Sequence, residues 1–438
     1  MGLLHWLACG VVGGTVGAWT SIILLPLAYF TTHHRRNLMV VVCGLGIVAS
    51  LWRSTVYFHH AEKLRWFGTI TDVVGQVCAP ADHRDSYTFL TICFTDPHTT
   101  VRAKSSAYTT IDVGDWVRVT GEIEQPETID SFDYAGYLER FCIFGIVDRP
   151  KITLVDSQLP TSLLFRAWRL LTDTRHSIEQ TINRSLPEPE ASFLAGLLLG
   201  SRRLIPDTVL ADLQRTGTTH IIAVSGANVV IIAGFVLYGA RFITHNPKMA
   251  YWISMLTIWS FVILTGISAA AVRGATVATF SIWASHARRY LPIGTALLIP
   301  AALSIIINPT IVHDIGWQLS YAAFFGILVV GPKLSKKMSR LSLKLPSTFV
   351  ETTAATLTTT PVSWWYFRTV SLSGLLVNPL ILWLIPLATG CGALLVAVAT
   401  VSPIVTSLVR IPTTLILRSI LTTIHLGSFI PLTWSAAS

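Results

Sequence analysis

Long apolar runs restrict the fold of this chain more than any other feature of its sequence. A helix needs about 20 mostly apolar residues to cross a bilayer, and such runs fill 2–30, 38–58 and most of 221–432. Hydrophobic residues make up 52% of the chain and charged residues only 13%, which is typical of a membrane protein. The first run is too long for a cleaved signal peptide and lacks its basic head and cleavage site.

The net charge of +9 is divided unevenly along the chain. Residues 62–156 hold 15 acids and 9 bases, a net of −6, so the rest of the chain carries about +15. Most of those bases lie in short loops between apolar runs. This distribution indicates the orientation of membrane helices rather than a nucleic-acid-binding surface.

Four basic loops predict that orientation. Basic loops lie at 35–36, 241–248, 286–289 and 333–340, and the last three are each two expected spans apart. All four therefore fall on the cytoplasmic side of the inner membrane, which places 62–156 outside. After the first two runs, the expected spans are 221–242, 250–265, 269–287, 292–307, 315–330, 350–367, two segments within 372–401, and 404–430 with breaks.

The segment 62–156 has the alternating pattern of β-strands. Its runs 67–77, 86–94, 99–103 and 115–123 alternate β-branched or aromatic residues with polar ones, and Gly, Pro and Asp separate them. About five short strands in this length predict a small barrel of the OB type. The predicted fold is thus a polytopic α-helical membrane protein with an inserted extracytoplasmic OB-type β-barrel domain.

Such barrels often hold single-stranded nucleic acid between basic and aromatic side chains. The acidic balance of the insert excludes a broad phosphate-binding surface but leaves Arg102, Lys104 and Tyr108 as candidate DNA contacts. A purely structural β-domain is an equally good interpretation.

Three cysteines also lie in the insert: Cys78, Cys93 and Cys142. In an oxidising compartment two of them could form a disulfide. The sequence leaves open which two would pair.

Three helices are expected between the insert and the main apolar region. The segment 161–186 has an apolar face with arginines elsewhere, as in helices that lie at a membrane interface. Two shorter helices are predicted at 190–199, ending at Gly200, and at 207–216, ending at Gly217.

Several polar residues lie within or beside the expected spans. An ionisable residue inside a bilayer is a functional candidate by default. The alternative is that these groups satisfy one another, and the threonine-rich run 352–360 favours helix packing through back-bonding. The candidate pore residues are His220, Ser225, Asn228, Arg273, Gln318 and Asn378.

Catalytic and metal motifs are missing from the sequence. His220 and Ser225 have no Gly-x-Ser-x-Gly motif around them, and the histidines form neither His-x-His nor His-Glu-x-x-His. The segment 326–333 lacks the Gly-Lys-Ser/Thr of a phosphate loop and is predicted to be a helix end. We therefore expect no enzyme activity, no cofactor and no metal.

Four blocks of residues occur together in a recognisable order. They are 197–202 with 216–229, then 265–275, 316–323 and 372–379. In this order they resemble the ComEC-type competence proteins, and the insert resembles the N-terminal OB-type domain of that family. The chain departs from the family at Asn228, where the usual residue is histidine.

The resemblance implies a channel that imports single-stranded DNA across the cytoplasmic membrane during natural transformation. It implies an extracytoplasmic DNA receptor and a cytoplasmic ATPase motor or strand-binding protein, because moving each phosphate inward costs ~2.3 kcal/mol per 100 mV. Many members carry a metallo-β-lactamase-like domain that this sequence lacks, so a separate nuclease is expected, with membrane lipid as the remaining partner. The alternatives are a small-solute or lipid-linked permease and a non-transporting assembly factor.

The expected organisation has four parts. Residues 1–60 hold two transmembrane helices, and 61–157 form the extracytoplasmic OB-fold-like domain. Residues 158–216 form amphipathic interfacial helices, and 217–438 form the competence-type channel domain.

Overall fold

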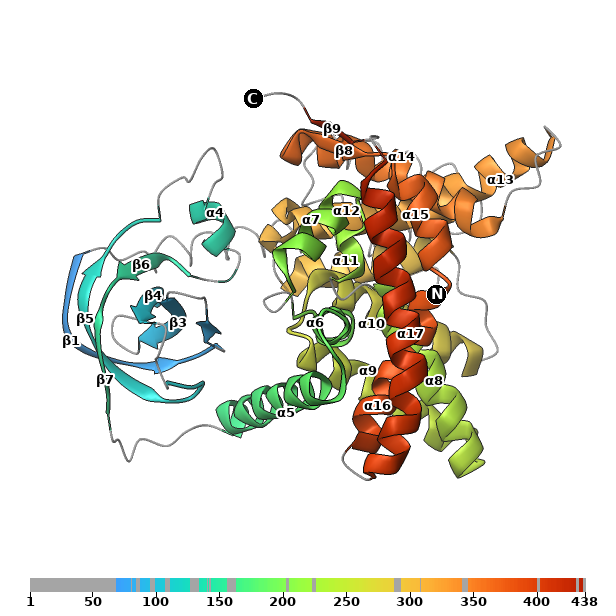
Figure 1. The fold of residues 1–438 in the computed structure, drawn as a ribbon. Helices are drawn as coiled ribbons and strands as arrows, with labels where there is room; N and C mark the ends of the chain where they lie inside the picture. The colour runs from blue at the N-terminus through green and yellow to red at the C-terminus, as the bar shows by residue number, and fades with distance from the viewer. Residues whose placement is uncertain are drawn as a thin grey trace, which may run out of the picture. The chain divides into compact units, whose positions relative to one another are not determined.

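The computed structural model contains a β-rich unit and a helical unit (Figure 1). The β-rich unit ends at Thr174 and includes 305–314, whereas the helical unit holds Arg175–Ser304 and the chain from Ile315 onward. The two spans expected before residue 60 lie outside the described residues. The structure describes residues 68–79, 81–83, 87–94, 99–106, 111–126, 134–139, 141, 143–155, 163–201, 205–222, 226–286, 293–307, 309–340, 346–399, 402–430 and 433–435.

The β-rich unit is a curled sheet of seven strands. Its order is β6-β4-β3-β1-β5-β7, with β2 beside β3. The pair β4–β6 is parallel, and the other pairs are antiparallel. Alternate residues of β3 are buried, so Leu90 and Ile92 enter the core with Val117 and Val119 of β5. The strands are β1 (Gly68–Val77), β2 (Asp82–His83), β3 (Tyr87–Phe94), β4 (Thr100–Ser106), β5 (Trp116–Ile123), β6 (Gly145–Asp148) and β7 (Lys151–Leu154).

Backbone hydrogen bonds join the two sides of this sheet at one end. Glu124, directly after β5, exchanges hydrogen bonds with Ile146 of β6, with N–O distances of 2.9 and 3.0 Å. The strands expected from alternation are confirmed, and the strands missed are the two- to four-residue elements β2, β6 and β7. Those runs are too short to show a period. The confirmed runs 67–77, 86–94, 99–103 and 115–123 correspond to β1, β3, β4 and β5.

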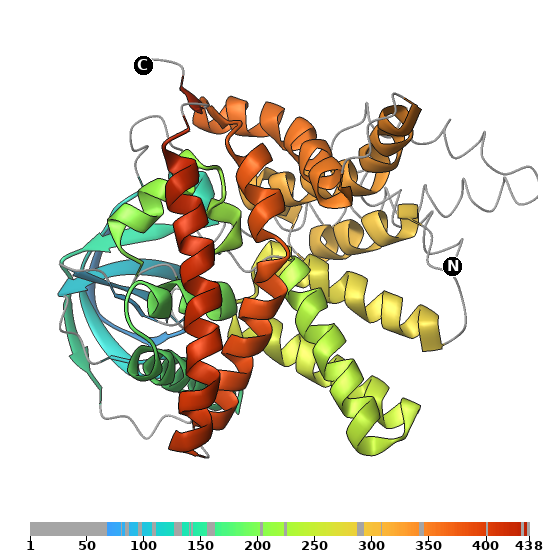
Figure 2. The ribbon, with the colours of Figure 1, turned by 45° about the vertical axis from the view of Figure 1, so that its right-hand side comes forward.

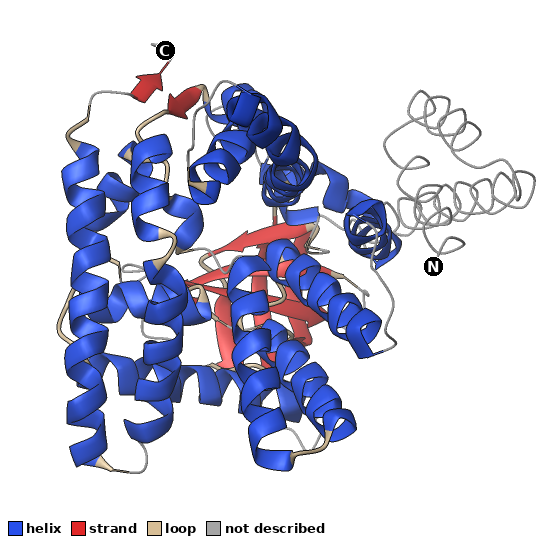
Figure 3. Ribbon diagram, turned by 90° about the vertical axis from the view of Figure 1, so that its right-hand side faces the viewer, coloured by secondary structure: helices blue, strands red, loops and turns tan. Residues whose placement is uncertain are grey.

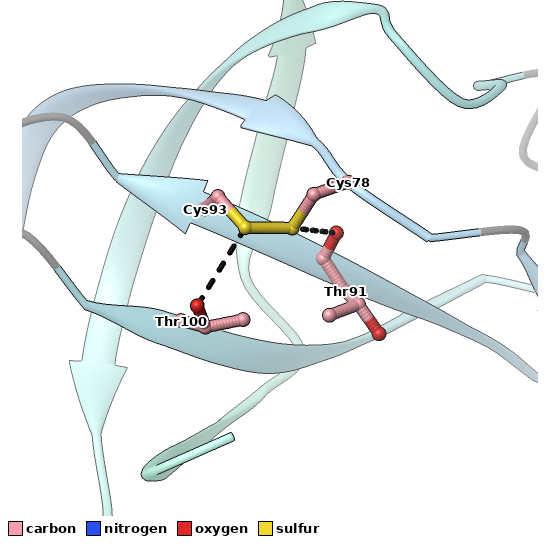
Figure 4. The surroundings of a disulfide bond; sticks show 4 residues. All are labelled: Cys78, Thr91, Cys93 and Thr100. Atoms are coloured by element: carbon pink, nitrogen blue, oxygen red, sulfur yellow. Dashed lines mark hydrogen bonds between the residues drawn. A yellow bond between two sulfur atoms is a disulfide. The ribbon is translucent and has the colours of Figure 1, made fainter. Parts of the chain in front are cut away.

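A disulfide joins Cys78 to Cys93 (Figure 4). Cys78 follows the last residue of β1 and Cys93 lies on the neighbouring β3, so the bond links two paired strands. The Thr100 hydroxyl lies 3.6 Å from Cys93 Sγ, within reach to donate to it. This settles the open choice among the three cysteines of the insert in favour of these two, while Cys142 lies outside the described residues.

The helix α5 (Leu163–Ser185) follows the sheet and confirms the helix expected at 161–186. Within the β-rich unit, Arg169 of α5 forms an ion pair with Asp115, and its Nε donates to the carbonyl of Val113 at 3.0 Å. These contacts fix the start of α5 to the turn before β5.

The helical unit consists of helices that pack side by side. Figure 2 shows α16 and α17 as neighbours, and the short strands β8 (Thr369–Ser371) and β9 (Thr433–Ser435) pair near the end of α17. The helices of this unit are α6 (Glu190–Leu199), α7 (Asp207–Arg215), η1 (Thr219–Ile221), α8 (Gly226–Thr244), α9 (Pro247–Leu264), α10 (Ala269–His286), α11 (Ile293–Ile307, except its last three residues), α12 (Ile315–Phe325), the π-helix η3 (Gly326–Val330), α13 (Gly331–Arg340), α14 (Ser347–Phe367), α15 (Gly374–Ile381), α16 (Leu384–Ala399) and α17 (Pro403–Ser428). The short helix η2 (Pro309–His313) belongs to the β-rich unit.

Two hydrophobic cores hold this unit together. Its helices are drawn in blue in Figure 3. All ten residues of α6 are buried, and they pack with residues such as Leu395 of α16 and Ile420 of α17. A second core forms between α8, α9 and α10 around Ile258 and Ala275. The helices predicted at 190–199 and 207–216 are thus confirmed, the first at its predicted bounds.

Three described helices are long and apolar enough to cross a membrane: Pro247–Leu264, Ile315–Ser339 and Pro403–Ser428. The pair α15 and α16, which is bent by 48°, would make a fourth if it counts as one span. A helical region of membrane-spanning length is therefore present, together with a curled sheet.

The helix end predicted at 326–333 is wrong. The chain stays helical over 315–340, because the π turn Gly326–Val330 joins α12 to α13. In the π turn the backbone bonds join residues five apart instead of four. Pro332 lies in the first turn of α13, directly after this change, where its missing N–H costs little. The basic loop predicted at 333–340 is therefore the helix α13.

The breaks predicted within 404–430 are also wrong, because α17 is continuous despite Pro412. Hydroxyls of Thr413 and Thr414 donate to the carbonyls four residues earlier, at 2.7 and 2.9 Å. Pro412 removes the single N–H that would bond the carbonyl of Leu408, and the helix continues on both sides of it.

Candidate functional site

Two glycines bring α8 and α10 into backbone contact. A Cβ added to Gly274 would lie 2.5 Å from Cα of Gly226 and 2.7 Å from its carbonyl oxygen. Only glycine fits at such a distance, which lets the two helices approach more closely than side chains would permit. The first and second sequence blocks therefore meet at this crossing.

Arg273 lies beside this crossing and reaches α12. Its Cζ is 4.9 Å from the ring centroid of Phe324 and 5.8 Å from that of Tyr321. A Cβ added to Gly226 would lie 3.0 Å from Nη2 of the same side chain. The guanidinium thus contacts two aromatic rings and the first residue of α8. The third sequence block, which contains Tyr321, meets the second here.

No acid among the described residues forms an ion pair with Arg273. Its Nε is buried and has no hydrogen-bond partner. Arginine keeps its charge in proteins, and a buried cation is costly unless an anion compensates it. Because α8 begins at Gly226, the positive end of that helix also lies beside the guanidinium. Two positive groups that no described acid neutralises form a site suited to an anion such as phosphate.

Hydrogen bonds from neighbouring elements position α12. Thr358 of α14 donates its hydroxyl hydrogen to the carbonyl of Ala322 with an O–O distance of 2.7 Å. Trp317 donates from Nε1 to the Ser304 hydroxyl at 3.0 Å, and its ring lies 4.4 Å from that of Tyr321. These contacts set the aromatic surface that Arg273 faces.

The threonine-rich run of α14 mainly back-bonds to its own helix, as the packing interpretation predicted. Thr353, Thr359 and Thr360 donate to carbonyls four residues earlier at 2.7–2.9 Å. Their hydroxyls are therefore engaged within α14.

Asn378 belongs to a second cluster, around the turn after α7. Hydroxyls of Ser371 and Ser373 donate to the carbonyl of Arg215 at 2.6 and 3.0 Å. A Cβ added to Gly374 would lie 2.9 Å from the Thr216 carbonyl oxygen and 3.4 Å from Nδ2 of Asn378. The first and fourth sequence blocks meet here, and Oδ1 of Asn378 is buried without a hydrogen-bond partner.

Two further candidate pore residues, Asn228 and His220, bond to backbone carbonyls of the first sequence block. Asn228 is buried and donates from Nδ2 to the carbonyl of Leu197 at 3.2 Å, which ties α8 to α6. His220 is exposed, with Nδ1 3.3 Å from the Gly217 carbonyl. Gln318 lies on α12 three residues before Tyr321 and is half-buried, whereas Ser225 lies outside the described residues.

Sequence reasoning missed two long-range side-chain contacts of α17. Glu190 of α6 forms an ion pair with Arg418 at 2.8 Å, and Asp212 of α7 forms a hydrogen bond with Nδ1 of His425 at 2.7 Å. An acid at the start of the apolar helix 190–199 was the available signal, since buried carboxylates need a partner. The aromatic partners of Arg273 were also missed.

The β-rich unit carries the other candidate DNA contacts. On one face of the sheet, the guanidinium of Arg102 lies 4.2 Å from the ring centroid of Phe89, and the ammonium of Lys104 lies 5.0 Å from that of Tyr87. Lys104 also pairs with Asp148 at 3.4 Å. Two cations and two aromatic rings thus share a surface of β3 and β4, whereas Tyr108 lies outside the described residues.

Among the described residues, no three His, Cys, Asp or Glu side chains come together in a way that could hold a metal ion. The arrangement is that of an α-helical protein with helices of membrane-spanning length, in which the second and third sequence blocks meet around an arginine that pairs with no described acid.

The chain belongs to the competence protein family, whose model matches residues 197–437. This confirms the family resemblance expected from the four blocks, all of which lie inside the matched region. The ComE operon protein 3 of Bacillus subtilis (strain 168) is 24% identical over 284 residues, which cover 64% of this chain and 35% of that protein. The chain thus spans about a third of the length of this relative. No solved structure matches the chain significantly.

Proposed function

We propose that this protein forms the channel through which single-stranded DNA crosses the inner membrane during natural transformation. The observation that carries the proposal is the Arg273 site, where a guanidinium and the start of α8 face no acid among the described residues. A strand moving through the helical unit would present phosphates to this site one after another. Family membership supports a role in DNA uptake.

Arginine suits this role because its planar guanidinium binds phosphate oxygens in pairs. A translocation path must also release each phosphate, so its binding sites must be weak. Stacking on Phe324 and Tyr321 holds the guanidinium in place while leaving it without a permanent counter-ion. Gln318 and Asn378 would add neutral polar contacts along the same path.

The curled sheet is proposed to be an OB-type domain outside the membrane. Its strands follow the circular order β1-β3-β4-β6-β5, the parallel pair is β4–β6, and the bridge between Glu124 and Ile146 joins the last two. The disulfide Cys78–Cys93 is consistent with an oxidising compartment. Arg102 and Lys104, each beside an aromatic ring, would receive the strand before it enters the membrane.

The proposed multi-pass organisation keeps the parts expected from the sequence. Residues 1–60 would hold two further spans, 61–157 the external domain, 158–216 interfacial helices and 217–438 the channel. Inward movement of phosphates costs ~2.3 kcal/mol per charge per 100 mV, so the proposal requires a cytoplasmic ATPase motor or strand-binding protein. A DNA receptor and a separate nuclease would complete the process, and the chain itself would not be an enzyme.

The test is import of labelled DNA into the cytoplasm, scored beside DNA bound at the cell surface. Deletion should abolish internal DNA while surface binding persists. Arg273→Gln should lower internal DNA about tenfold, since a bond to a charged group contributes about 1.5–3 kcal/mol. Arg273→Lys should retain part of the import. Arg410→Gln is the matched control, because Arg410 is an exposed arginine of α17.

Two outcomes would overturn the proposal. If deletion leaves internal DNA unchanged, the channel assignment fails and a solute permease or an assembly factor takes its place. If Arg273→Gln imports as much DNA as wild type while the protein reaches the membrane, the arginine is not a contact of the strand.

A further inference from the structure

An aromatic pocket lies between the first turns of α9 and the last turn of α10. It has a volume of about 310 Å³, and Lys248, Tyr251, Trp252, Trp283 and His286 line it. The rings of Tyr251 and His286 lie 5.3 Å apart, which joins the two helices at this point. None of these residues takes part in the Arg273 site, which lies about 15 Å away along α10, the rise of ten helical residues.

The pocket continues into an apolar stripe on α9. Met249, Trp252 and Leu256 are 55%, 69% and 73% exposed, and their spacing of three and four residues places them on one face. The helix α9 is one of the three described helices long enough to span a membrane. Large apolar side chains exposed along such a helix are suited to contact with acyl chains. Trp252 belongs both to this stripe and to the pocket.

The polar end of the pocket is cationic. Lys248 is exposed, and no acid among the described residues pairs with it. The side chain of Asn246 already accepts hydrogen bonds from the amides of Lys248 and Met249, at 3.0 and 3.4 Å. Those two amides are therefore engaged, and the ammonium of Lys248, with the ring N–H of His286, remains to bind an anion.

We infer that this pocket binds one anionic glycerophospholipid, with its phosphate on Lys248 and His286 and an acyl chain along the stripe of α9. Tryptophan and tyrosine at the end of a span favour the interfacial region of a bilayer, where headgroup and acyl chain meet. Basic pockets between membrane helices are suited to anionic headgroups. The stripe favours a lipid over a nucleic acid, which would leave those apolar side chains uncovered. This inference rests on the proposed position of α9 in the bilayer.

Native mass spectrometry of the detergent-purified full chain tests the assignment. The probes are dioleoylphosphatidylglycerol and dioleoylphosphatidylcholine supplied in equal amounts. Wild type should retain phosphatidylglycerol preferentially, and Lys248→Gln should lower that preference about fivefold, the effect of one lysine near an anionic surface. Lys248→Arg should restore it, and Lys336→Gln on α13 is the matched control. Trp252→Ala should lower retention of both lipids.

Equal retention of phosphatidylglycerol by wild type and Lys248→Gln would overturn the inference. Displacement of the lipid by glycerol phosphate alone would show a phosphate site without acyl recognition, and displacement by an oligonucleotide would show a nucleic-acid surface; either result overturns it. DNA import measured with the same variants separates the two proposals. The lipid site alone is rejected if wild type shows no lipid preference while the membrane-inserted Lys248→Gln variant imports DNA normally. If the wild-type chain is absent from the membrane fraction, the channel is rejected as well.

Discussion

Two arginines of the helical unit are held in opposite ways. Arg418 lies 2.8 Å from Glu190, whose side chain is 3% exposed, so its charge is matched by a carboxylate of the same chain. Arg273 faces two aromatic rings and no described acid. The first arrangement fixes α17 to α6. The second leaves a guanidinium that no described carboxylate neutralises, so the two sites should respond differently to the same substitution.

The largest effect on stability should come from the crossing that supports Arg273. Gly274→Ala places a Cβ 2.5 Å from backbone of Gly226, so the helices must separate, at a cost of about 3 kcal/mol. Gly234→Ala is the control, because a Cβ there meets nothing within 4 Å and should stabilise α8 by up to about 1 kcal/mol. Thermal unfolding of the purified protein measures both. If Gly274→Ala were as stable as Gly234→Ala, the backbones of α8 and α10 would not be in close contact at this crossing.

The paired arginine should give the next largest effect. Arg418→Gln leaves the buried Glu190 carboxylate without its partner, which should cost about 2 kcal/mol of unfolding free energy, reduced by the exposure of Arg418. Adding Glu190→Gln should recover most of that loss, because it removes the unpaired charge. A double-mutant cycle measures the coupling, and additive losses would contradict the pairing.

A smaller effect is expected at the contact between α12 and α14. Thr358→Val removes the hydroxyl that bonds the Ala322 carbonyl at 2.7 Å, which should lower the free energy of unfolding by about 1 kcal/mol. Thr360→Val is the control, since that hydroxyl bonds only within α14 among the contacts described. Denaturant unfolding compares the two, and the expectation is wrong if Thr360→Val costs more.

The unpaired arginine should give the smallest change in stability. Arg273→Gln loses the ring contacts but also relieves a buried charge, so the unfolding free energy should change by less than about 0.5 kcal/mol. The same variant is expected to lose most DNA import. A loss of stability as large as that of Arg418→Gln would mean that both arginines serve the fold.

The sequence predicted local structure better than long-range pairing. Alternation of apolar and polar residues located the longer strands, and the stop signals at Gly200 and Gly217 located the ends of α6 and α7. These signals lie within the element or within a few residues of it. The continuity of α12 into α13 was missed because a π turn has no reliable sequence signal. The pairing of Glu190 with Arg418 spans 228 residues, so no local pattern could reveal it.

The candidate site divides in the same way. Arg273 could be selected from one rule, that charges are rare in spans, but its rings on α12 depend on how three helices cross. Asn228 was selected as a polar residue at the start of an apolar run, and its amide bonds to the Leu197 carbonyl of α6. A polar residue in an apolar run therefore indicates that burying it costs free energy. Whether it serves packing or binding depends on the residues that the fold places beside it.

The burial of α6 has a consequence for synthesis. Ribosomes add roughly 5–20 residues per second, so the 228 residues between Glu190 and Arg418 take on the order of 10–50 s to appear. During that interval the nascent α6 has neither its ion-pair partner nor the helices α16 and α17 that cover it. The packing around α6 is thus completed only after α16 and α17 have been synthesised, although α6 itself is translated much earlier.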